Sequence, residues 1–288
     1  MSPETNTTNL TSSFITNHVT SADGTAIGYR QLGRGPGLIL VHGGMMASQN
    51  FMKLAALLAD DFTVYIPDRR GRGLSGPHGA YYGLARECED IKALVNKTAA
   101  QHIFGLSSGA IISLQSALEN SSIRKVALYE PPFFAPLAWV PRFDREVARG
   151  DLAAAMMTVI KATGDTSVMT ILPRFITVPL LRLAVKADKN EIKNKDEVAI
   201  KDLIPTMHYD PQLVQETQGN LNGFKSLDIP VLLLGGSKSQ KYLKAALDQL
   251  ETILPNVRRI EFKGLGHTSA NNDEQPGPIA EELRRFFL

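Results

Sequence analysis

Short apolar runs alternate with amphipathic stretches along most of this chain. The runs are rich in Val, Ile and Leu and are bounded by Gly, Pro or Asp, a pattern typical of β-strands. The stretches between them carry apolar residues at helical spacing, as in Leu84, Cys88, Ile91 and Val95. Strands that alternate with helices predict an α/β fold, with a mostly parallel eight-stranded sheet flanked by helices. The predicted strands span residues 14–20, 26–32, 38–41, 63–66, 101–104, 125–129, 229–234 and 259–262.

The alternation stops between Phe133 and about Phe224. This stretch carries helical patterns, several prolines and much of the lysine. The strand–helix rhythm resumes after it and runs to a closing helix. We therefore predict one core made of residues 1–130 and 226–288, with residues 131–225 inserted as a helical cap over one edge of the sheet.

The charge of the chain excludes some classes of partner. Net charge is +2 over 288 residues, which is too small to favour nucleic acid or an anionic membrane surface. The tight basic cluster at residues 68–72 reads Asp-Arg-Arg-Gly-Arg, and we expect it to be a solvated loop. The single cysteine, Cys88, excludes an intrachain disulfide and is expected to be a small buried side chain.

The sequence carries no pattern for membrane insertion or secretion. No run approaches the ~18 apolar residues needed to span a bilayer. Residues 1–13 are polar and lack the basic and apolar regions of a secretory signal. We expect a cytoplasmic protein with a loose N-terminal tail, and a homodimer is compatible with the sequence.

The stretch Gly105-Leu106-Ser107-Ser108-Gly109 fits G-x-S-x-G. It lies between a predicted strand and a predicted helix, the context in which this spacing forms a very tight turn with serine at its apex. The glycines let strand and helix approach without a Cβ clash. The pattern predicts that Ser107 is a nucleophile held above the sheet.

Polar residues follow the ends of several predicted parallel strands. They are His42-Gly43-Gly44, Asp68, Ser107, Glu130 and His267. Ligands bind at the carboxyl ends of the strands in open parallel sheets, so these loops are predicted to meet in one site.

Four motifs together resemble those of the α/β-hydrolase-fold enzymes, over nearly the whole chain. They are VHGG at 41–44, DRRGRGLS at 68–75, GLSSG at 105–109 and GLGH at 264–267. The resemblance implies a serine nucleophile, a histidine base near the C-terminus and an acid between them. We assign the base to His267, because an imidazole both takes and returns a proton near pH 7.

The acid departs from the commonest family pattern, which places an aspartate just after the strand at 231–234. Here no carboxylate appears until Asp248, inside a helix, and Asp228 precedes the strand at the far edge of the sheet. Glu130 closes the preceding strand, where a minority of these enzymes, similar to dehalogenases and a fungal mycotoxin lactone hydrolase, carry their acid. We predict that Glu130 orients His267, and that Asp68 braces the arginine-rich loop.

The oxyanion hole requires two backbone N–H groups aimed at one point. We assign these to Ser108 and Gly44, with Gly43 or Met45 as alternatives to Gly44. We expect His42 to support that loop. Substrate-binding residues are predicted at Gly43, Met45, Phe133, Trp139 and Met207.

The family resemblance implies a serine hydrolase that cleaves a small or medium, largely apolar ester or lactone through an acyl-enzyme. No metal and no organic cofactor are expected. The same scaffold also supports cofactor-free oxygenases, haloperoxidase-like enzymes and C–C bond hydrolases, and a non-catalytic ligand-binding protein is a further alternative. The inserted residues 131–225 are expected to set the substrate.

Overall fold

The computed structural model describes residues 13–163, 168–191, 197–219 and 221–288. Nearly all of the predicted N-terminal tail lies outside these residues. The predicted eight-stranded sheet is confirmed, with strand order β1-β2-β4-β3-β5-β6-β7-β8. The strands are β1 (Ile15–Thr20), β2 (Ala26–Gly33), β3 (Gly37–Val41), β4 (Thr63–Pro67), β5 (His102–Leu106), β6 (Lys125–Tyr129), β7 (Val231–Gly236) and β8 (Val257–Phe262).

The sheet is parallel except at one edge. β1 and β2 form the predicted hairpin and β2 runs antiparallel to β4, whereas all pairings from β4 to β8 are parallel. Parallel neighbours need crossover connections, and the helices between the strands supply them. The carboxyl ends of β3 to β8 therefore meet along one edge.

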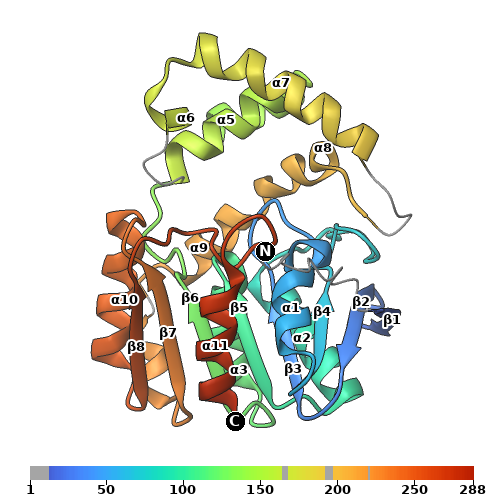
Figure 1. Ribbon diagram of the computed structural model, residues 1–288, viewed down its shortest axis with the longest axis vertical. Helices are drawn as coiled ribbons and strands as arrows, with labels where there is room; N and C mark the ends of the chain where they lie inside the picture. The colour runs from blue at the N-terminus through green and yellow to red at the C-terminus, as the bar shows by residue number, and fades with distance from the viewer. Residues whose placement is uncertain (1–12, 164–167, 192–196, 220) are drawn as a thin grey trace, which may run out of the picture.

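Helices cover both faces of the sheet (Figure 1). Successive residues of a strand face opposite sides, so Ile39 and Val41 pack on one layer while Leu38 and Leu40 pack on the other. The first layer holds α2 (Leu84–Thr98), α3 (Ser108–Glu119) and α10 (Lys241–Ile253); the second holds α1 (Met52–Leu58), which follows the 3-10 turn η1 (Ser48–Phe51), and α11 (Pro276–Phe287). Cys88 is buried on α2, as predicted.

The described residues between β6 and β7 are largely helical, and we call residues 131–225 the inserted segment. Figure 1 shows α5 to α8 as a layer above the sheet. The outer helices α4 to α8 have small apolar clusters of their own, which include Met157, Leu181 and Phe143. The elements are α4 (Val140–Ala148), α5 (Leu152–Thr163), α6 (Val168–Ile171), α7 (Arg174–Glu191), α8 (Ile200–Leu203), η2 (Ile204–His208), α9 (Asp210–Thr217) and η3 (Leu221–Ser226).

Both ends of the inserted segment pack into the main core. Phe133 at its start and Leu213, Leu221 and Phe224 near its end belong to the larger apolar cluster of the sheet. The segment is thus attached to the core at two places, and the outer helices α4 to α8 lie between them.

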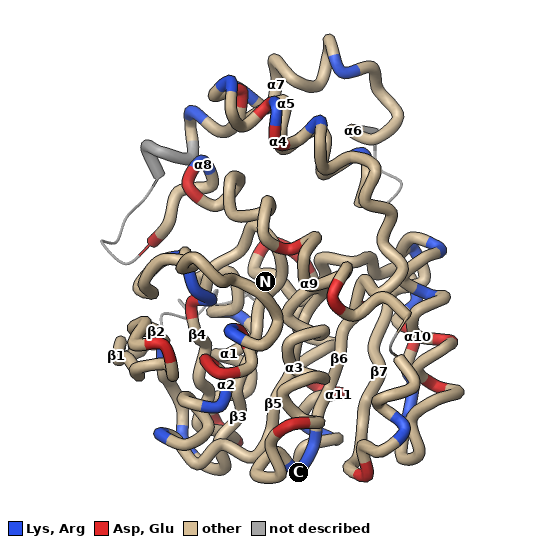
Figure 2. The backbone as a smooth tube through the Cα atoms, turned by 180° about the vertical axis from the view of Figure 1, so that it is seen from behind, with Lys and Arg blue, Asp and Glu red and all other residues tan. Residues whose placement is uncertain are grey.

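Charged positions are interspersed over the molecule. Figure 2 shows Lys and Arg mixed with Asp and Glu along the core and the inserted segment. Among the residues that the structure describes, no helix has the length and apolar character to cross a bilayer.

Candidate active site

Ser107 lies at the turn between β5 and α3, as the G-x-S-x-G spacing predicts. Its φ of 56° and ψ of −125° fall where residues other than glycine are rarely found. A Cβ on Gly105 would lie 2.3 Å from the Gly109 carbonyl oxygen, and a Cβ on Gly109 would lie 2.3 Å from the Val41 carbonyl oxygen. The two glycines therefore permit the close approach that lifts the serine hydroxyl above the sheet.

His267 lies beside Ser107 in the loop after β8. Its Nε2 is 3.0 Å from Ser107 Oγ, and its Nδ1 is 2.7 Å from Glu130 Oε2. The Tyr129 hydroxyl donates to the Gly266 carbonyl at 2.7 Å and so holds this loop against the end of β6. A carboxylate that accepts Nδ1–H places the lone pair on Nε2, where it can accept the serine proton. The structure brings together the three residues predicted as nucleophile, base and acid.

The Glu130 carboxylate is buried and bound on both sides. One oxygen faces His267, and the other accepts the backbone N–H of Gly236 at 2.6 Å. A Cβ on Gly235 would lie 3.1 Å from Glu130 Oε1. The head of Glu130 therefore occupies the end of β7, where the common family pattern has an aspartate, and the Gly-Gly pair leaves room for it.

Asp228 and Asp248, the carboxylates nearest β7 in sequence, are both exposed. Asp248 forms an ion pair with Arg259 on β8. The two ring nitrogens of His267 face Glu130 and Ser107.

The two predicted oxyanion donors, Gly44 and Ser108, line one cavity with Ser107 and His267. Ser108 is the first residue of α3, where backbone N–H groups have no partner within the helix and the helix dipole is positive. This location is suited to hold a developing negative charge.

His42 is buried and links two loops behind the cavity. Its Nε2 accepts the Arg69 N–H at 3.2 Å, which requires the proton on Nδ1, 3.0 Å from the Gly43 carbonyl oxygen. Burial, assisted by Arg72 and Arg69, holds the pKa of His42 well below its usual range. Neutral His42 thus supports the glycine loop, as predicted.

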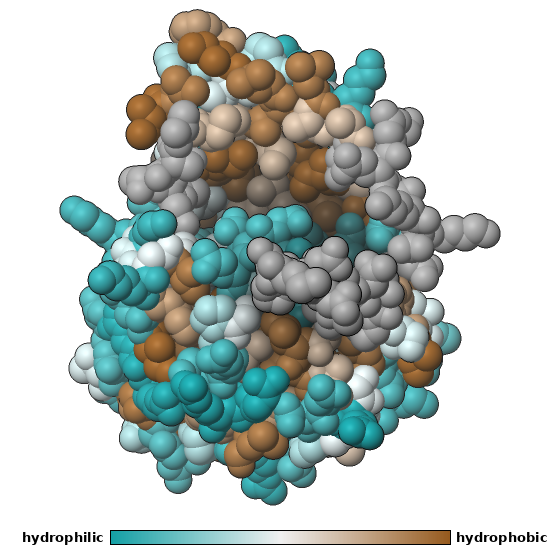
Figure 3. Space-filling model, viewed as in Figure 1, coloured by the Kyte–Doolittle hydropathy of each residue, from teal (hydrophilic) through white to brown (hydrophobic). Residues whose placement is uncertain are grey.

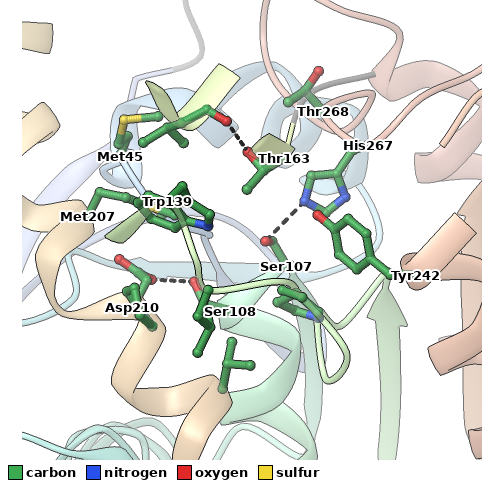
Figure 4. Close-up of a pocket in the computed structure, with 17 residues that line it drawn as sticks. Met45, Ser107, Ser108, Trp139, Thr163, Met207, Asp210, Tyr242, His267 and Thr268 are labelled. Atoms are coloured by element: carbon green, nitrogen blue, oxygen red, sulfur yellow. Dashed lines mark hydrogen bonds between the residues drawn. The ribbon is translucent and has the colours of Figure 1, made fainter. Parts of the chain in front are cut away.

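The cavity beside Ser107 measures about 130 Å³ and has mostly apolar walls. Figure 4 shows His267 and Tyr242 on one side of Ser107, and Trp139 and Met207 on the other. The surface is hollowed beneath the outer helices, with apolar residues gathered at the upper rim (Figure 3). The lining residues are Gly44, Met45, Ser107, Ser108, Pro132, Ala135, Leu137, Trp139, Val159, Thr163, Met207, Asp210, Pro211, Val214, Tyr242, His267 and Thr268.

Three of the predicted substrate-binding residues line the cavity: Met45, Trp139 and Met207. Phe133 does not, which corrects its assignment. It is 1% exposed, and its ring packs 6.1 Å from that of Phe224 in the main core. The chain at Phe133 has only just left β6, so the ring turns into the sheet–helix layer.

Gly43 also lies outside the cavity lining. A Cβ at Gly43 would lie 3.0 Å from Ser107 Cβ, which places this residue directly behind the serine. The structure adds four polar lining residues that sequence reasoning missed: Thr163, Asp210, Tyr242 and Thr268. Thr268 directly follows the GLGH motif, whereas the other three lie in no motif.

The arginine-rich loop after β4 is buried, which corrects the expectation of a solvated loop. Arg69, Arg70 and Arg72 are each at most 2% exposed. Arg69 pairs with Glu87 at 2.7 Å and Arg70 with Asp90 at 2.6 Å, both acids being on α2. Charges are tolerated inside a protein when they are paired and hydrogen-bonded, and these arginines meet carboxylates from other elements.

Asp68 braces this loop, as predicted. Its carboxylate accepts the backbone N–H groups of Ser48 at 2.6 Å and Leu74 at 3.0 Å. Burial raises the pKa of Asp68 above its ordinary value. Among the side chains that the structure describes, no group of three His, Cys, Asp or Glu residues is placed to hold a metal ion.

Comparison with known proteins gives similar sequences and similar folds. The chain is 24% identical over 257 residues to the carboxylesterase YbfK of Bacillus subtilis, covering 88% of this chain and 80% of that protein. It is 24% identical over 245 residues to the 2-(acetamidomethylene)succinate hydrolase of Mesorhizobium japonicum, covering 83% and 84%. An alpha/beta hydrolase of Sphaerobacter thermophilus has a similar structure, with a TM-score of 0.76 and 28% identity over 94% of this chain and all of that one.

The model of one protein family matches residues 38–282, which span β3 to most of α11 and include every predicted site residue. The fold, the serine turn and the order of the motifs agree with that match. The chain belongs to the alpha/beta hydrolase family.

Proposed function

We propose that this protein is a serine hydrolase that cleaves a neutral carboxylic ester or lactone. The observation that carries the proposal is the continuous hydrogen-bonded relay from Ser107 through His267 to Glu130, with separations of 3.0 and 2.7 Å, at the wall of an apolar cavity. Chains of this kind activate a serine hydroxyl that is otherwise a weak nucleophile.

In the proposed reaction, Ser107 Oγ attacks the carbonyl carbon while its proton passes to His267 Nε2. Glu130 holds Nδ1–H and stabilises the imidazolium that forms. The negative charge on the carbonyl oxygen is held by the N–H groups of Ser108 and Gly44. His267 then protonates the leaving alcohol, and a water molecule activated by the same imidazole releases the acid.

The cavity favours an uncharged substrate. Among the described residues that line it, none is Lys or Arg, so a substrate carboxylate would find no cation there. The carboxylesterase similarity supports an ester, and the apolar walls suit an ester or a lactone with a small acyl part.

We also propose that the inserted segment acts as a cap that selects the substrate. It contributes Trp139, Val159, Thr163 and Met207 to the cavity, whereas the core contributes the relay. Replacing these side chains is therefore expected to change the substrate range before it changes the chemistry.

The experiment compares wild-type protein with Ser107→Ala and with Ser122→Ala, an exposed serine on the loop after α3. The readouts are hydrolysis of short p-nitrophenyl esters and labelling by a fluorophosphonate. Wild type and Ser122→Ala should hydrolyse and label, and Ser107→Ala should do neither. Folded wild-type protein that neither labels nor cleaves any ester or lactone would contradict the proposal.

A further inference from the structure

Asp210 carries a carboxylate from the inserted segment to the edge of the relay. It is the first residue of α9, it is 3% exposed, and it lines the cavity. In Figure 4 its carboxylate is turned toward Ser108. The proposed reaction gives it no chemical step, yet a buried charge beside a reacting carbonyl needs a reason to be there.

Its contacts fix the side chain of Ser108. The Ser108 hydroxyl donates to Asp210 Oδ1 at 2.5 Å, and the same hydroxyl accepts from Arg69 Nη1 at 3.0 Å. Arg69 Nη1 also donates to Asp210 Oδ1 at 2.9 Å. The hydroxyl is thus held from two sides, which restrains the backbone at the first position of α3, the proposed source of one oxyanion N–H.

The same arginine reaches the loop that carries the other oxyanion donor. The Arg69 backbone N–H binds His42, whose ring supports the Gly43 carbonyl. The inserted segment also packs on Gly44 directly: a Cβ there would lie 2.7 Å from Met207 Sδ and 3.3 Å from Asp210 Cγ. Both proposed donors are therefore backed by this part of the segment.

The charges in this cluster balance. Asp210 Oδ2 accepts from Arg72 Nη2 at 2.7 Å, and Glu87 accepts from Arg69, so two guanidinium groups face two carboxylates. Burial alone would raise the pKa of Asp210, but Arg69 and Arg72 outweigh it and hold that pKa well below its usual range. The carboxylate is ionised under any assay condition near neutral pH.

We propose that Asp210 is a positioning residue for the oxyanion hole, acting through Ser108 and Arg69. The inference rests on the proposed function. On this inference the inserted segment forms part of the oxyanion hole. The two backbone N–H groups stay aligned only while Asp210 keeps its contacts with Ser108 and Arg69. Small misalignments of such donors are costly, because their effect depends on where they point in the transition state.

The test uses Ser108→Ala, which keeps the backbone N–H and loses the hydroxyl, together with Asp210→Asn. The matched control is Asp144→Asn, another acid of the inserted segment, whose pair with His208 is exposed. The probes are a p-nitrophenyl ester, the trifluoromethyl ketone of the same acyl group, and the alcohol formed by reduction of that ketone. The alcohol has no carbonyl carbon for Ser107 to attack. Ser107 Oγ adds to the ketone carbon, the carbonyl electron pair moves onto oxygen, and the proton passes to His267, so this ligand reports on the hole.

We expect kcat to fall about 10- to 100-fold in both variants, with KM within threefold of wild type. The inhibition constant of the trifluoromethyl ketone should rise by a similar factor, and that of the alcohol should not change. Asp144→Asn should stay within twofold in all readouts. A merely structural role for Asp210 would weaken ketone and alcohol binding in parallel.

The outcomes separate this inference from the proposed function. Wild-type protein that neither cleaves esters nor binds the ketone would remove the proposed function. If the wild-type protein is active and kcat of Ser108→Ala lies within twofold of the wild-type value, the role of Asp210 is overturned and the proposed function stands. Should Asp210→Asn fail to fold, Ser108→Ala still decides.

Discussion

Glu130 reaches His267 from the end of β6 while its second carboxylate oxygen accepts the N–H of Gly236 at the end of β7. One side chain thus joins two strands and the base. Its backbone has a φ of 49°, in the left-handed region that residues other than glycine rarely adopt. Contacts hold both oxygens of the Glu130 carboxylate, so replacing this side chain tests its role directly.

Replacement of Glu130 by Gln should lower kcat by about two orders of magnitude or more, because an amide no longer stabilises the imidazolium. Steady-state hydrolysis of a p-nitrophenyl ester measures the loss. Glu119→Gln, an exposed position at the end of α3, is the control and should keep wild-type rates. An unchanged rate in Glu130→Gln would exclude this residue as the acid.

Gly235→Ala should also reduce activity, about threefold to tenfold, since misplacement of a catalytic group is costly. The new Cβ would lie 2.7 Å from Leu247 Cδ1 and 3.1 Å from Glu130 Oε1, so it pushes on the carboxylate. Gly277→Ala on α11, where nothing lies within 4 Å, is the matched control. It should leave kcat unchanged. If Gly235→Ala and Gly277→Ala had the same kcat, the expected displacement of the Glu130 carboxylate would be contradicted.

His78 should make the free energy of unfolding depend on pH. Burial, with the nearby charge of Arg72, lowers its pKa from 6.5 to about 4, and its ring stacks on Tyr209 at 3.5 Å. Between pH 4 and 6.5 the unfolded chain then binds more protons than the folded one, so stability falls as pH falls through this window. Urea unfolding at several pH values should show this slope.

His78→Phe keeps an aromatic ring at that position and removes the titration. Its slope between pH 4 and 6.5 should be smaller than that of wild type. Thr16→Ser, a change without a titratable group at an exposed position of β1, is the control and should keep the wild-type slope. An identical slope in wild type and His78→Phe would refute the assignment.

Arg70→Ala should destabilise the protein by about 3–5 kcal/mol, because it leaves the buried Asp90 carboxylate without its partner. Chemical denaturation measures the change. The double variant Arg70→Met with Asp90→Leu should recover much of the loss, since it removes both charges together. A single variant as stable as wild type would show that the pair contributes nothing.

Short-range constraints explain why the serine turn was predictable. The strained backbone at Ser107 needs glycines two residues away on either side, so the whole requirement lies within the five residues 105–109. The parallel sheet was predictable for a similar reason, because strands buried on both faces leave continuous apolar runs. His267 was found through its place after the last strand.

Long-range pairing explains what sequence reasoning did not find. Arg69 and Arg72 were expected in solvent because charges are usually exposed, but Asp210, about 140 positions later, compensates them in the interior. Asp210 itself lies in no motif, so nothing in its neighbours predicted a contact with Ser108. Phe133 was assigned to the cavity as an aromatic residue of the inserted segment, yet its ring packs against Phe224 in the main core.

The ion pairs of Asp210 with Arg69 and Arg72 lie beneath the outer helices and limit how a substrate can reach Ser107. Lifting the whole inserted segment would separate Asp210 from Arg69 and Arg72 and so break both buried ion pairs. A movement of α4 to α8 alone would break neither of these ion pairs. We therefore expect that any opening of the cavity is confined to α4 to α8 and leaves Ser107, His267 and Glu130 in place.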